Sequence, residues 1–171
     1  ATKTNSPYVG FGLNGSNPVY LPSSANGDKF TYRDFTFSGN AFGIYSTEAL
    51  TVETSGTSTF TTNTYSSVWS DSSITFRGTG RLNLNASDAT VVRAALSVGI
   101  NGGVIYVTAK DRAAVYAGTG ITANGGAIIA SNSSENSVTI TTGGAMTVSG
   151  CNVQAINSGS GNALGVTNSL T

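Results

Sequence analysis

Histidine is absent from the 171-residue sequence, and cysteine, methionine and tryptophan occur once each. Without histidine, the chain lacks the commonest general base, the Ser-His-Asp arrangement and most zinc sites. The single cysteine, Cys151, excludes an internal disulfide and a thiolate metal cage, and we expect it to pack as a small hydrophobic residue. No apolar run approaches the ~18 residues of a membrane-spanning helix. These absences exclude the histidine- and thiolate-based centres of many enzymes and metalloproteins.

Charged residues are scarce, at 9% of the chain, and eight basic residues balance eight acidic ones. The basic residues are scattered, whereas nucleic-acid binding relies on clustered cations that neutralise phosphates. Between residues 113 and 171 the only charged side chain is Glu135. A surface this neutral is unusual for a freely soluble monomer. We therefore exclude nucleic acid as a partner and expect the protein to associate with itself.

The abundant residues are small, polar or turn-forming: Thr, Ser, Asn and Gly occupy 24, 23, 16 and 22 positions. Hydrophobic residues still make up 39% of the chain, which is not the composition of a disordered protein. A Thr-rich chain punctuated by glycine is typical of an all-β protein. The chain starts at Ala1 without Met, so we expect a leader to have been removed and the mature protein to be extracellular, at a cell or virion surface. Glycosylation sequons at Asn14, Asn85 and Asn132 are expected by chance in so Asn- and Ser-rich a chain.

One short pattern recurs five times: a hydrophobic residue, Ser or Thr, a second hydrophobic residue, and Gly a few positions later. Its copies are LTVETSG (50–56), ITFRG (74–78), LSVG (96–99), ITANG (121–125) and VTITTG (138–143), which start at Leu50, Ile74, Leu96, Ile121 and Val138. The starts are 24, 22, 25 and 17 residues apart, and such spacing is typical of stacked repeats.

Each unit divides into three short strands that end at glycine or a polar turn, as in LSVGINGG, VIYVTA and KDRAAVYAG. Three strands in about 22 residues predict a parallel β-helix, or β-solenoid, of five to six turns, with equivalent strands pairing at ~4.8 Å. Hydrophobic positions such as Ile74 and Phe76 are expected to point inward, and the Thr or Ser between them outward. A β-sandwich or jelly roll is the alternative, because Asn-Gly at 26–27, 101–102 and 124–125 is also a hairpin signal.

The first 49 residues differ in composition from the repeats, because they contain all three prolines and most of the phenylalanines. We expect residues 1–49 to form an aromatic, Pro-containing β cap or assembly segment, and residues 50–171 to form the solenoid repeats. Phe30 and Tyr32 alternate in one phase whereas Phe35 and Phe37 alternate in the other. This change of phase predicts a bulge or a change of strand near Asp34.

No comparable cap follows the last repeats. Leu164, Val166 and Leu170 still have the pattern of solenoid turns. An open turn presents unpaired backbone groups and apolar side chains. We therefore expect these residues to form an assembly end that meets another subunit or a further domain.

Carboxylates remain as candidates for catalysis. Asp88 and Asp111 lie 23 residues apart, about one repeat, which predicts that they share a face. They are either a metal-binding or catalytic pair or, as we favour, two turn residues. Trp69, Tyr106 and Tyr116 are candidates for stacking against sugars, although packing at corners is the interpretation that we favour.

The units LSVGINGGVIYVTAKDRAAVYAG and VTITTGGAMTVSGCNVQA resemble those of secreted bacterial right-handed parallel β-helix proteins that bind carbohydrate. They are similar also to β-helical phage spikes and surface adhesins, and the resemblance covers residues 72–171. The carbohydrate-binding family implies binding of calcium and acidic sugars through paired acids after the second strand. The matching places here read KDRA (110–113) and SNSSENS (131–137), with a single acid in each.

Two functions are consistent with these patterns. We favour an extracellular structural protein, not an enzyme, whose solenoids self-assemble into a filament, sheath, spike or coat and which needs no cofactor. The alternative is a polysaccharide-binding module, or the non-catalytic part of a polysaccharide-degrading protein. A lyase or hydrolase would depend on Asp88 and Asp111, the only candidate pair.

Overall fold

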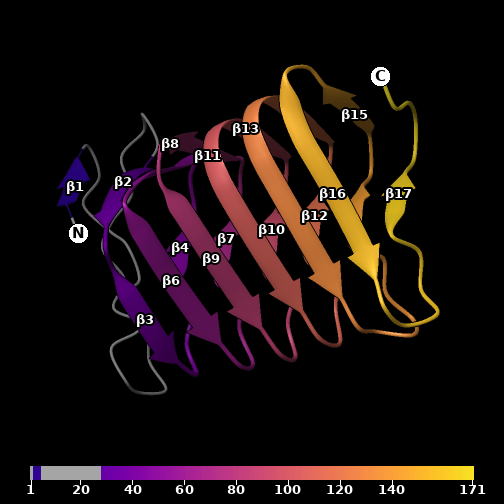
Figure 1. The fold of residues 1–171 in the computed structure, drawn as a ribbon, viewed down its shortest axis with the longest axis horizontal. Coiled ribbons are helices and arrows are strands. Elements are labelled where there is room, and N and C mark those ends of the chain that lie inside the picture. Colours follow the sequence, from indigo (N-terminus) through magenta and orange to yellow (C-terminus); the bar gives the residue numbers. More distant parts are fainter. Residues whose placement is uncertain (1, 5–27) are drawn as a thin grey trace.

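The computed structural model describes residues 2–4 and 28–171, which form a parallel β-solenoid of about six turns (Figure 1). Each turn has three strand segments, and each segment pairs in parallel with its equivalents in the neighbouring turns. The predicted all-β solenoid is confirmed. The hairpin interpretation of Asn-Gly at 101–102 and 124–125 is wrong, because both pairs lie within long strands that pair in parallel. The third Asn-Gly pair, at 26–27, lies outside the described residues.

Three walls run along the solenoid axis. The first wall contains β2 (Asp28–Arg33), β5 (Leu50–Ser55), β8 (Ile74–Gly78), the start of β11 (Ser97–Ala109), the start of β13 (Gly120–Asn132) and β15 (Ala145–Val148). The second wall contains β3 (Thr36–Gly39), β6 (Thr57–Thr62), β9 (Arg81–Ala86), the later parts of β11 and β13, and β16 (Cys151–Asn157). The third wall contains β4 (Ile44–Ser46), β7 (Val68–Ser70), β10 (Val92–Ala94), β12 (Val115–Ala117), β14 (Ile140–Thr142) and β17 (Leu164–Val166).

Residues 28–46 form a turn of this same solenoid, and β1 (Thr2–Thr4) pairs antiparallel with β2. Residues 1 and 5–27 of the predicted cap lie outside the described residues. In the part of the chain that the structure describes, no helix is long and apolar enough to cross a membrane.

Two of the predicted repeat starts are wrong. The aligned first-wall positions are Leu50, Ile74, Val98, Ile121 and Met146, so the repeats are 24, 24, 23 and 25 residues long. Leu96 precedes its strand and is 47% exposed, and Val138 precedes β14 in the third wall. The error arises because third-wall strands such as Ile-Thr-Thr carry the same hydrophobic-Thr pattern as the first wall.

The core is a narrow column of inward side chains. Strand β5 shows the reason most clearly, because its buried and partly exposed residues alternate along its whole length. Aliphatic side chains fill the middle turns, among them Ile74, Val98 and Ile121. Near the N-terminal turns the column is aromatic: Tyr32 and Phe60 are fully buried, with ring centroids 5.1 Å apart. Hydrophobic burial and edge-to-face contact together hold this end of the column.

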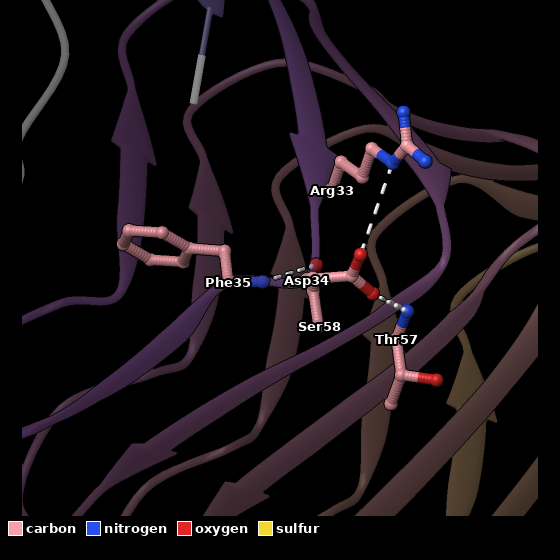
Figure 2. A network of polar contacts seen from close by, with 5 residues as sticks. All are labelled: Arg33, Asp34, Phe35, Thr57 and Ser58. Carbon is pink, nitrogen blue, oxygen red and sulfur yellow. Dashed lines mark hydrogen bonds and ion pairs between the residues drawn. The ribbon is translucent and has the colours of Figure 1, made fainter.

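A change of strand occurs at Asp34, as the sequence predicts (Figure 2). The φ angle of Asp34 is 48°, a left-handed conformation that Asp tolerates better than most residues because its side chain bonds locally. One carboxylate oxygen accepts a hydrogen bond from the Thr57 amide at 2.9 Å, and the other lies 3.8 Å from Arg33 Nε. The amide of Phe35 donates to Ser58 Oγ at 3.2 Å. The corner thus ties the first turn to the second.

Substitutions of Asp34 test whether its side-chain acceptor and its left-handed conformation stabilise the corner. We expect Asp34→Ala to lower the free energy of unfolding by about 1–2 kcal/mol, because it removes an amide acceptor and places alanine in a left-handed conformation. Asp34→Asn retains both the acceptor and the local bonding, so its stability should stay near that of the wild type. Urea denaturation of the three proteins measures the difference, and equal losses in both variants would contradict this description of the corner.

The buried phenol of Tyr32 predicts a stability loss at alkaline pH. Burial raises the pKa of Tyr32 well above its ordinary value, because the phenolate would lose its hydration. In the unfolded chain the phenol is hydrated and loses its proton near pH ~10. The folded protein is therefore fully stable with respect to this group below that pH, and its free energy of unfolding falls as the pH rises above it. Denaturation at increasing pH should show a shallower decline for Tyr32→Phe than for the control Tyr116→Phe. Identical declines would contradict the prediction.

Candidate functional site

One column of outward side chains on the third wall combines aromatic rings with an arginine. The middle residues of successive third-wall strands align in register as Tyr45, Trp69, Arg93, Tyr116, Thr141 and Gly165. Their flanking residues point into the core, which leaves these positions on the surface. The column brings together Trp69 and Tyr116, two of the predicted sugar-stacking residues.

An aspartate holds two rings of this column. Asp71 accepts hydrogen bonds from Tyr45 Oη at 2.6 Å and from Trp69 Nε1 at 2.8 Å. Phe42 stacks on Tyr45, with centroids 5.3 Å apart, and meets Trp69 edge to face at 5.2 Å. These contacts fix the indole in one orientation.

Arginines cover the rings that sequence analysis proposed for sugar stacking. The Arg93 guanidinium lies over Trp69, 4.6 Å from the ring centroid, and 5.6 Å from that of Tyr116. Tyr106 is on the second wall, away from this column, with Arg81 3.9 Å from its centroid. Cation–π contacts of this kind use the ring faces that a sugar would need. The geometry favours packing over sugar stacking for these rings.

Beside Trp69 a groove of about 390 Å³ lies at the corner between the second and third walls. Its lining includes Ser66, Trp69, Asp88, Thr90, Arg93 and Arg112. The turns 87–91 and 110–114, which join the two walls in successive repeats, supply Asp88, Thr90 and Arg112. The groove therefore combines two guanidinium groups with one carboxylate, beside an indole ring and two hydroxyl groups.

Asp88 and Asp111 belong to stacked turns. The Asp111 amide donates to the Ser87 carbonyl at 3.1 Å, which places one turn above the other, and the Asp88 amide donates to the Asn63 carbonyl at 2.8 Å. The Asp111 carboxylate lies 3.5 Å from Lys110 Nζ. Asp88 lines the groove, whereas Asp111 is not part of its lining. Among residues 2–4 and 28–171, no group of three or more His, Cys, Asp or Glu side chains is placed to hold a metal ion.

Sequence reasoning missed Arg93 and Arg112. Trp69, Arg93 and Tyr116 are 24 and 23 residues apart, one repeat each, so the repeat length was a signal that could have aligned them. Arg112 follows Asp111 in the sequence, and its place beside Trp69 depends on the path of the corner turn 110–114.

The predicted assembly end is a second candidate site. Leu164 and Leu170 are 37% and 57% exposed, and Val166 is partly buried. A hollow of about 540 Å³ at this end is lined by residues that include Met146, Val148, Cys151, Val153, Leu164 and Leu170. Burial raises the pKa of the Cys151 thiol, an effect that a backbone hydrogen bond at Ile128 partly offsets, so the thiol stays protonated near neutral pH.

The sequons differ in accessibility. The Asn132 side chain is buried, donates to the Arg112 carbonyl at 2.8 Å and accepts from the Ser134 amide at 2.8 Å. Asn85 is partly buried on the second wall, and Asn14 lies outside the described residues. The Asn132 amide is thus already engaged in the folded protein.

Comparisons of the chain with protein-family models, with curated proteins and with solved structures found no match. What the structure establishes is a parallel β-solenoid of about six turns with an aromatic cluster near its N-terminal turns.

Proposed function

We propose that this protein is an extracellular structural subunit whose solenoids associate end to end, with the turn β15–β16–β17 covered by a second copy of the chain. One observation carries the proposal: inward positions of β16 are only half-buried. Val153 and Ala155 align with Ile128 and Ala130 of the preceding turn, which are 1% and 0% exposed. Burying such apolar surface is favourable, at roughly 25 cal/mol per Å².

The backbone of this turn supports the same proposal. Within the described residues β16 pairs only with β13, whereas the other edge of β15 is already bonded to residues 169–171, with the Met146 and Val148 amides donating to the Ser169 and Thr171 carbonyls at 2.8 Å each. The outer edge of β16 presents peptide groups that could form a further parallel ladder. A docked turn would extend the hydrogen-bond pattern that joins all the earlier turns.

The opposite end of the solenoid has complementary edges. Figure 1 shows β1–β4 at one end of the long axis and β15–β17 at the other. In the described part of the chain β3 pairs only with β6, whereas β1 covers β2. Contact between copies would therefore use the second wall, with β16 facing β3.

Low charge favours this contact. Glu135 is the only charged residue between positions 113 and 171. Like charges stacked one strand apart repel each other, so a neutral end permits close approach of identical subunits. The same neutrality supports packing in a polymer better than independent existence as a soluble monomer.

Two lysine substitutions on one strand test the proposal. Val153 points inward on β16 and Gln154 points outward, so Val153→Lys places a charge in the stacking surface and Gln154→Lys serves as its matched control. We expect analytical ultracentrifugation to show growth of the wild type with concentration. Val153→Lys should weaken association about tenfold or more, because it buries an unpaired charge, and Gln154→Lys should assemble like the wild type. A wild type that stays monomeric, or equal effects of both lysines, would contradict the proposal.

A further inference from the structure

We propose that the groove beside Trp69 binds an acidic segment of another protein, with an Asp or Glu side chain of that partner held between Arg93 and Arg112. The groove lies on the outer side of the solenoid, away from the open turn, so this inference does not rest on end-to-end association. Four features of the groove support it.

The first feature is unpaired positive charge. Arg93 and Arg112 are exposed and take part in none of the ion pairs formed among the described residues, which are Lys29–Glu53, Arg33–Asp34 and Lys110–Asp111. Two guanidinium groups face the single carboxylate of Asp88 in the groove. Binding one further carboxylate would balance the charge. A polyanion such as a nucleic acid would need a longer row of cations.

The second feature is preorganisation. Arg93 is held between the Trp69 and Tyr116 rings, and neither Arg93 nor Arg112 donates a side-chain hydrogen bond to another described residue. The planar guanidinium of Arg93 therefore keeps its N–H donors available for a carboxylate, and the two rings already set its orientation. Less conformational entropy is lost when the ligand binds to a side chain that is already restrained.

The third feature is the residue composition of the surrounding surface. Phe42 and Tyr65 pack with centroids 4.8 Å apart next to Trp69, and Tyr65 and Tyr116 remain 42% and 37% exposed. Trp, Tyr and Arg are the residues that carry most of the energy in protein–protein interfaces. Only 9% of this chain is aromatic, so gathering these rings beside two arginines is a marked local enrichment.

The fourth feature argues for a protein segment over a polysaccharide. A sugar ring stacks on an open aromatic face, but Arg93 lies over Trp69 and Phe42 meets the same indole edge to face. A carboxylate needs only the guanidinium edges, and an apolar side chain of the partner can pack against the exposed Tyr65. The groove volume of about 390 Å³ is near the lower end of the range of ligand-binding pockets.

A library of random peptides displayed on phage tests the proposal. Panning on the wild type, after depletion on Arg93→Gln/Arg112→Gln, should enrich peptides that carry Asp or Glu beside an apolar residue. Trp69 is the only tryptophan in the sequence, so its fluorescence reports binding of a synthetic copy of the enriched peptide directly at the groove.

The titration has matched controls. We expect Arg93→Gln and Arg112→Gln each to weaken binding about tenfold, and Arg77→Gln, an exposed arginine on the first wall, to leave it unchanged. Replacing the acid of the peptide by its amide should also weaken binding about tenfold. The Val153→Lys variant should bind the peptide like the wild type, which separates this inference from self-association. Circular dichroism confirms that each variant is folded.

Three outcomes would overturn the inference. One is that panning enriches no acidic peptide. Another is that the enriched peptide binds Arg93→Gln and Arg112→Gln as tightly as Arg77→Gln. The last is that a short oligogalacturonate binds through the same two arginines while the peptide does not, which would assign the groove to an acidic glycan.

Discussion

Parallel hydrogen bonding between successive turns is the interaction on which the rest of this structure depends. In a solenoid every strand bonds to the strand one repeat before it and one repeat after it, at a spacing of ~4.8 Å. Equivalent residues are therefore stacked, as with Leu50, Ile74 and Val98 inside the column. Outside it, amide and hydroxyl groups bond along the axis, as when Asn63 donates to Asn40 at 2.6 Å. The abundance of Thr, Ser and Asn follows from this geometry, because each can bond or pack against its own kind.

The same constraint creates two surfaces with different chemistry. Along the axis, a turn is complete only when another turn covers it. The inward residues Val153 and Ala155 of β16 are apolar and only half-buried, and the strand carries no charged side chain. Perpendicular to the axis, outward side chains form columns, and a column can combine residue types that attract one another. Arg93 stacks between Trp69 and Tyr116 in this way. One surface thus suits repetition of the fold, and the other suits recognition of a different molecule.

The sequence could predict features that depend only on the alternation of inward and outward residues along one strand. It predicted less well those that depend on how residues of different turns align. Alternation placed Ile74 and Phe76 in the core, and a change of phase located the corner at Asp34. Register was harder, because Ile140-Thr-Thr in the third wall imitates a first-wall strand and misled the assignment at Val138. The groove required both register and the path of the corner turns, which bring Arg112 beside Trp69 from a repeat two turns away. The proximity of Arg112 to Trp69 therefore cannot be read from the pattern of residues within either segment.

Hydrogen exchange on β16 tests the central claim, that a second copy of the fold completes the open turn. Amides of an edge strand that point away from its partner exchange rapidly, whereas amides bonded in a ladder are protected. Raising the protein concentration should therefore slow exchange along Cys151–Asn157, together with β3 at the opposite end, and leave β9 in the middle unchanged. Exchange along β16 that stays rapid while the protein associates would contradict the account.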